Sequence, residues 1–164
     1  MKDRQNTDIP VAEQKAFFAK GKTRDVNFRI AALRRLREGI RRREKEIAAA
    51  LHADLHKSSF ESYMTEIGMT LDEIGFLIRH VKEYAKPQRV PATLSQFPAK
   101  CRIQKEPYGV TLVMSPWNYP FLLALEPAAG AIAAGNCCII KPSAYAPAVS
   151  RVIRELVEEL FDPA

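Results

Sequence analysis

Two short apolar runs separated by a helix-length segment constrain the fold more than any other feature of this sequence. Residues 110–114 are β-branched or apolar throughout, and residues 137–140 form a second run of the same kind. Such runs are typical of strands buried on both faces of a parallel sheet. Residues 121–134 are apolar nearly all round and residues 147–161 are amphipathic, so each predicts a helix. The order β-α-β-α is the start of a right-handed doubly wound α/β unit.

Residues 1–86 have the periodicity of helices. Asp8 and Pro10 indicate the start of a short helix, which Gly21 ends. From Ile30 to Leu55, apolar residues recur at spacings of three, four and seven, and this predicts one long amphipathic helix.

A third helix is predicted to begin at Ser58, which stands three residues before Glu61 in the capping-box spacing, and to end before Pro87. Its expected inner stripe is Phe60, Met64, Ile67, Leu71, Ile74, Ile78 and Val81. The sequence therefore predicts an N-terminal helical layer over residues 1–86.

Four prolines punctuate residues 87–108, which have no helical period. Leu94, Phe97, Cys101 and Ile103 suggest strand-like pieces, and the break at Pro98 turns one piece back on the other. We interpret this segment as a protruding β-ribbon arm, which needs a partner strand elsewhere in the protein or in a second subunit. The predicted α/β unit then occupies residues 109–164, where two strands form the first half of a doubly wound sheet.

Composition excludes several classes of function. The 164 residues are 47% hydrophobic, enough for a globular core, and the net charge of +6 comes largely from an arginine-rich run between Arg34 and Lys45. Glutamates dilute this run and no aromatic residues interleave with it, so a solvated helix face is favoured over a nucleic-acid site. Three cysteines and an N-terminus without an apolar signal core favour the cytoplasm, and no segment is long enough to cross a membrane.

Asn118 and Lys141 are the candidate functional residues, because each directly follows or ends a predicted parallel strand. An amide at Asn118 can donate to developing negative charge, and a cation at Lys141 can meet a cofactor. The plainer alternatives are a helix-capping asparagine and a solvated lysine. His52 and His56 have a spacing that can hold a metal, but no third ligand is evident, so no metal is predicted.

Four motifs resemble the N-terminal part of an aldehyde dehydrogenase, and the likeness covers essentially the whole chain. They are Ser115-Pro-Trp-Asn-Tyr-Pro-Phe121, Glu126-Pro with Gly130 to Asn136, Ile140-Lys-Pro-Ser143, and Lys105-Glu-Pro-Tyr-Gly-Val110. The last of these is similar to the class 3 branch. The resemblance implies an NAD- or NADP-dependent oxidation of aldehydes to carboxylic acids, with an aldehyde substrate that the sequence does not identify.

The resemblance also implies roles for individual residues. Asn118 would donate its amide to the oxyanion of a thiohemiacetal, and Lys141 would bind the adenosine ribose of the cofactor. The remaining implied cofactor contacts are Met114, Ser115, Pro116, Trp117 and Ser143. Taken by itself, Trp117 reads as a packing residue.

Two departures from the family pattern stand out. Ala144 occupies the place of a common glutamate that shares the ribose hydroxyls, which makes NADP as plausible as NAD, although drift would look the same. The family's glycine-rich loop, general-base glutamate and nucleophilic cysteine come later in a longer chain, so this chain alone is predicted to be inactive. Cys137 and Cys138 do not match that nucleophile and are predicted to be core residues of a strand. Cys101, in the arm, is predicted to be a small apolar packing residue.

The sequence leaves two further hypotheses open. The chain could be a catalytically inactive interaction module whose ribbon at residues 87–106 pairs with a full-length dehydrogenase or forms a homo-oligomer. It could also be a truncated gene product. A doubly wound sheet that stops at two strands predicts an apolar edge in either case.

Overall fold

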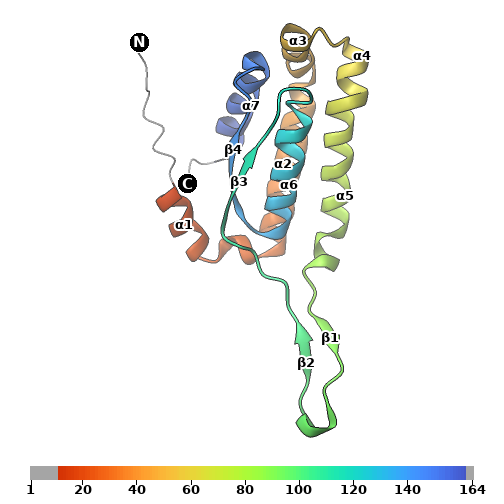
Figure 1. The fold of residues 1–164 in the computed structure, drawn as a ribbon, viewed down its shortest axis with the longest axis vertical. Helices are drawn as coiled ribbons and strands as arrows, with labels where there is room; N and C mark the ends of the chain where they lie inside the picture. Colours follow the sequence, from red (N-terminus) through yellow and green to blue (C-terminus); the bar gives the residue numbers. More distant parts are fainter. Residues whose placement is uncertain (1–10, 162–164) are drawn as a thin grey trace.

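The computed structural model describes residues 11–161, a helical body with a two-stranded arm (Figure 1). Helix α1 (Val11–Ala19) stops before Gly21, whose φ of 75° lies in the left-handed region, as the sequence predicts. The predicted start at Asp8 and Pro10 lies outside the described residues. Within residues 11–161, no helix combines the length and apolar character needed to cross a bilayer.

The prediction of one helix from Ile30 to Leu55 is wrong, because the structure has two. Helix α2 (Val26–Arg42) and helix α3 (Glu44–Leu55) meet at Arg43, whose φ of −101° and ψ of 14° are not helical. The Arg43 guanidinium lies 2.8 Å from the Glu159 carboxylate and 3.6 Å from that of Glu155, both on helix α7 (Pro147–Leu160). The bend therefore occurs where α7 contacts both segments.

The third predicted helix forms in three pieces, α4 (Ser59–Ser62), a π-helical turn (Tyr63–Ile67) and α5 (Gly68–Tyr84). The Ser58 cap is confirmed, since its hydroxyl accepts the Glu61 N–H at 3.1 Å.

The inner stripe of this helix is predicted correctly only from Ile67 onward. Phe60 and Met64 are 76% and 54% exposed, and Ser62 and Glu66 are fully buried in their place. The π-helical turn adds a residue to one turn and so moves the inward face off the 3.6-residue period.

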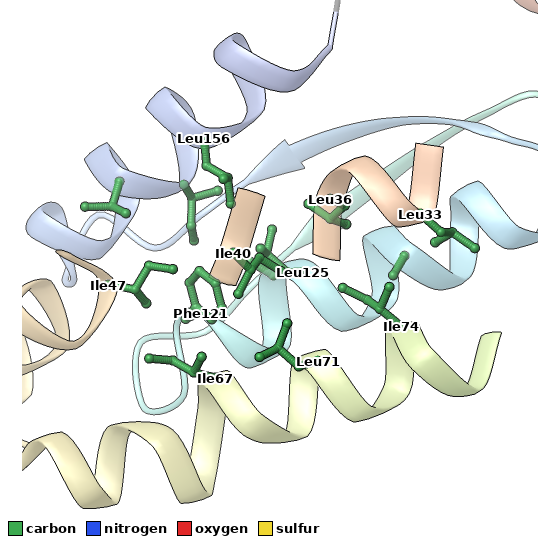
Figure 2. Packing of buried hydrophobic residues seen from close by; sticks show 14 of the residues in the cluster. Leu33, Leu36, Ile40, Ile47, Ile67, Leu71, Ile74, Phe121, Leu125 and Leu156 are labelled. Atoms are coloured by element: carbon green, nitrogen blue, oxygen red, sulfur yellow. The ribbon is translucent and has the colours of Figure 1, made fainter. Parts of the chain in front are cut away.

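One apolar core joins the helices. Helix α6 (Leu122–Ala134) packs against both α2 and α5, which also contact each other (Figure 1), and α7 packs beside α3 and α2. Figure 2 shows Phe121, directly before α6, between Ile47 of α3 and Ile67 of the π-helical turn. Phe121 is fully buried. This side chain thus fixes the end of the loop before α6 to the centre of the core.

The β-α-β-α order is confirmed. Strands β3 (Val110–Met114) and β4 (Cys137–Lys141) are parallel, with Val110 opposite Cys137 and Met114 opposite Lys141. The prediction that both faces of the strands are buried is wrong for β3, since its Leu112 and Met114 are 55% and 69% exposed. Within residues 11–161 this sheet has two strands, and the helices cover only one face of β3.

A buried arginine holds the turn between α6 and β4. Gly135 has a φ of 91° and ends α6, as predicted. The Arg29 side chain donates to the carbonyl oxygens of Thr23 at 2.6 Å and Ala133 at 3.3 Å. Burial lowers the pKa of Arg29, and the Asp25 carboxylate partly offsets this. Asn136 then accepts the Gly109 N–H at 2.9 Å, which ties the start of β3 to this turn.

The predicted β-ribbon is confirmed as strand β1 (Gln88–Val90) paired antiparallel with β2 (Cys101–Ile103). Figure 1 shows it extending away from the helical body. Leu94 belongs to a 3-10 turn rather than to a strand. Leu94 and Phe97 at its tip are 95% and 84% exposed. The boundaries that separate residues 1–86, 87–108 and 109–164 stay predictions.

Candidate active site

The parallel pairing brings Met114 and Lys141 together at the carboxyl end of the sheet. They are opposite residues of β3 and β4, and both are exposed. The Ser115 N–H continues the ladder by donating to the Lys141 carbonyl oxygen at 3.2 Å. Polar side chains at this end of a parallel sheet face the region where α/β folds bind ligands.

The loop after β3 presents a mixed apolar and polar surface. Pro116, Trp117 and Asn118 are exposed, with Trp117 55% exposed. Ser115 is buried, and its hydroxyl oxygen has no hydrogen-bond partner in the part of the chain that the structure describes. A buried hydroxyl without a partner is unfavourable, so this atom has capacity for a ligand or a water.

The Asn118 side chain does not cap α6. Both first amides of that segment, at Phe121 and Leu122, donate instead to one Glu66 carboxylate oxygen, at 2.8 and 3.2 Å. The Asn118 side chain makes no hydrogen bond to any residue in the described range 11–161. Its carboxamide is therefore free to donate outward.

Sequence reasoning missed Lys57 and Glu66, which lie directly behind the Asn118 loop. Lys57 Nζ donates to Glu66 Oε1 at 2.6 Å and to the Asn118 carbonyl oxygen at 3.3 Å. It also lies 4.0 Å from the centroid of the Tyr119 ring. The sequence around Glu66 mixes polar and apolar residues, so it carries no signal that this carboxylate is buried.

Ser143 is part of the turn that leads into α7. Its hydroxyl accepts the Tyr145 N–H at 3.2 Å, and its carbonyl oxygen accepts the Ser150 hydroxyl at 2.8 Å. Asp54 caps α7 by accepting the N–H groups of Ala148 and Val149. Ser143 thus fixes the chain after Lys141, and a cofactor contact by its hydroxyl stays a prediction.

Cys137 and Cys138 lie at the wrong end of the sheet for catalysis beside Asn118. Cys137 pairs with Val110, and the four following residues separate it by about 13 Å from the end of β4. Burial raises the pKa of both thiols, and a hydrogen bond with Thr111 partly offsets this at Cys138. They line a cavity of about 440 Å³ between α1, α2 and α7. Neither thiol is activated as a nucleophile.

The other sequence candidates have structural roles in the described part of the chain. His52 Nδ1 lies 3.1 Å from the Lys57 carbonyl oxygen, and His56 ends α3 with a φ of 58°. Residues 11–161 contain no cluster of three or more histidine, cysteine or acidic side chains suited to a metal. In the arginine run, Arg42 pairs with Glu159 at 2.9 Å, next to Arg43.

The sequence profile of the aldehyde dehydrogenase family matches residues 1–164. The chain belongs to the aldehyde dehydrogenase family. Its relatives include a 4,4'-diaponeurosporen-aldehyde dehydrogenase from Staphylococcus aureus, 47% identical over 150 residues. Aldehyde dehydrogenase family 3 member H1 from Arabidopsis thaliana is 40% identical over 154 residues, which supports the class 3 resemblance. A dimeric NADP-preferring aldehyde dehydrogenase from dog is 39% identical over 152 residues.

A solved structure gives the same result for the fold. The substrate-bound state of Staphylococcus aureus AldH superposes with a TM-score of 0.91 at 46% identity, over 93% of this chain and 33% of that one. The matches to the S. aureus, Arabidopsis and dog relatives cover 92%, 94% and 93% of this chain. The chain spans about a third of their length, at 33%, 32% and 34%. The incomplete aldehyde dehydrogenase fold predicted from the sequence is confirmed.

Proposed function

We propose that this chain is the N-terminal part of an NAD- or NADP-dependent enzyme that oxidises aldehydes to carboxylic acids, with Asn118 as the oxyanion donor. The observation that carries this proposal is the Asn118 carboxamide, which is exposed and unpaired within residues 11–161. Its backbone is held from behind by Lys57. A donor that is fixed before substrate arrives stabilises developing negative charge most effectively.

The residues beside Asn118 fit a dinucleotide. Lys141 offers a cation at the strand end, and Met114 and Trp117 offer exposed apolar surface. The unpartnered Ser115 hydroxyl offers a further polar contact. Lys141 would bind the ribose hydroxyls, while the bound dinucleotide would accept a hydride from the substrate. Ala144 is exposed and carries no carboxylate, so it does not oppose a phosphate on the ribose, and NADP remains as suitable as NAD.

Asn118 would act on the oxygen of the aldehyde. When a thiolate adds to the carbonyl carbon, that oxygen gains negative charge, and the Asn118 amide N–H donates to it. Cys137 and Cys138 are too distant and too weakly acidic to supply the thiolate. We therefore expect the 164-residue chain alone to show no aldehyde oxidation, with the nucleophile contributed by a longer protein or a partner.

Titration of Trp117 fluorescence with NAD and NADP tests the cofactor part of this proposal. Trp117 is the only tryptophan of the chain. We expect Kd values of about a millimolar or weaker, and roughly tenfold weaker binding in Lys141→Ala, since one charged hydrogen bond is lost. Lys45→Ala, which removes an exposed lysine from α3, is the matched control. Equal losses in both variants would contradict the assignment, and so would thiol-dependent aldehyde oxidation by the purified chain.

A second candidate function is self-association or pairing through the ribbon formed by β1 and β2. Three apolar side chains on it, Leu94, Phe97 and Ile103, are 95%, 84% and 54% exposed. Such an arm is too small to be stable without a partner surface. We expect the chain to form homo-oligomers or to co-purify with a full-length relative. Phe97→Asp should weaken this association in sedimentation experiments. Tyr108→Asp, a change at a 97% exposed side chain outside the ribbon, is the control.

A further inference from the structure

A buried ion pair lies directly beneath the loop that carries Asn118. Lys57 Nζ and Glu66 Oε1 are 2.6 Å apart, and the two side chains are 9% and 0% exposed. Burying two charges costs free energy that their mutual attraction offsets only with good geometry and further hydrogen bonds. This pair therefore contributes little to stability unless its remaining polar atoms are engaged.

Those remaining atoms all bind the same short segment. The second oxygen of Glu66 accepts the Phe121 and Leu122 N–H groups at 2.8 and 3.2 Å. A carboxylate at the start of a helix also interacts favourably with the helix dipole. Glu66 can reach this position because it lies in the π-helical turn, which directs a polar side chain into the core.

Lys57 holds the other side of the loop. Its ammonium donates to the Asn118 carbonyl oxygen at 3.3 Å and lies 4.0 Å from the Tyr119 ring centroid. Lys57 and Glu66 together thus hold the backbone at Asn118, Phe121 and Leu122. These contacts fix the position of the Asn118 backbone, and with it the point from which the exposed carboxamide extends.

We propose that Lys57 and Glu66 are positioning residues that fix the backbone of the Asn118 loop, and so set the position from which the Asn118 carboxamide reaches the oxyanion. This inference rests on the proposed function for the catalytic meaning of that direction. The positioning itself is a property of the 164-residue chain. Lys57 and Glu66, from the helical layer, would thus support a site that is formed at the carboxyl end of the sheet.

The test uses variants that keep side-chain shape, Lys57→Met and Glu66→Gln. We expect the Phe121 and Leu122 amides to exchange with deuterium roughly 10- to 100-fold faster in Glu66→Gln, because a charged acceptor is lost. The fluorescence anisotropy of Trp117, next to Asn118, is expected to fall in both variants. Mass spectrometry and fluorescence at micromolar concentration give the two readouts.

Asp54→Asn is the matched control, because Asp54 accepts the Ala148 and Val149 amides of α7 in the same way. It should accelerate exchange at α7 and leave Trp117 anisotropy unchanged. Each single variant leaves one buried charge without its partner, whereas the double variant Lys57→Met with Glu66→Gln removes both charges. The urea midpoint of the double variant should therefore lie above those of the single variants, while its anisotropy stays low.

Three outcomes would overturn the proposal. They are unchanged exchange and anisotropy in both single variants, equal anisotropy changes in Asp54→Asn, and an anisotropy that recovers fully with the urea midpoint in the double variant. None of these readouts needs a cofactor. Failure of the proposed function would instead appear as equal losses of NAD and NADP binding in Lys141→Ala and Lys45→Ala, with the exchange pattern intact.

Discussion

Phe121→Ala is expected to lower the free energy of unfolding of this chain by about 3–5 kcal/mol. Phe121 is fully buried and lies between Ile47 and Ile67 (Figure 2). Truncation removes most of a large apolar side chain and leaves a cavity where α3, α6 and the π-helical turn meet, and close-packed helices collapse only partly around such a void. Urea denaturation followed by circular dichroism measures the loss.

Phe60→Ala is the matched control for this prediction. It makes the same chemical change on a side chain that is 76% exposed, so the midpoint should move by no more than about 0.5 kcal/mol in free energy. A similar loss in the two variants would show that Phe121 is not at the centre of the core. A loss at Phe60 alone would mean that the capped start of α4 is covered in solution.

Local periodicity predicted those elements whose inner faces are purely apolar. Ile67, Ile74 and Val81 are buried as the helical spacing requires, and α7 buries Val149 and Leu156 in the same way. These positions follow from the geometry of one helix. No knowledge of the neighbouring elements is needed to place them.

Positions decided by a partner far along the chain were predicted poorly. The bend at Arg43 depends on Glu155 and Glu159, which come from another helix. The exposure of Leu112 depends on which strands complete the sheet, and the described residues supply two. A pattern of apolar residues carries neither kind of information.

The candidate site divides in the same way. Parallel-strand topology predicts that Met114 and Lys141 lie together at the carboxyl end of the sheet, and the two residues are indeed opposite each other in β3 and β4. The contact between Lys57 and Asn118 joins residues 61 positions apart, and Glu66 is buried although its neighbours in the sequence are partly polar. Only the folded arrangement shows that these two residues support the loop.

Gly135→Ala is expected to destabilise the chain by about 3–4 kcal/mol, the sum of a backbone effect and a steric effect. An alanine at a φ of 91° is strained by about 1–2 kcal/mol. Its Cβ would also lie 2.6 Å from the Arg29 guanidinium. Arg29 cannot move away freely, because it is buried and donates to Thr23 and Ala133 at 2.6 and 3.3 Å, so moving it weakens charged hydrogen bonds.

Gly21→Ala separates the two effects. Gly21 has a φ of 75°, but an added Cβ there meets no atom within 4 Å, so only the backbone strain of about 1–2 kcal/mol applies. The urea midpoint of Gly135→Ala should therefore fall clearly below that of Gly21→Ala. Equal midpoints would mean that Arg29 yields without loss. In that case the turn before β4, and with it the register that places Lys141 opposite Met114, would not depend on the buried guanidinium.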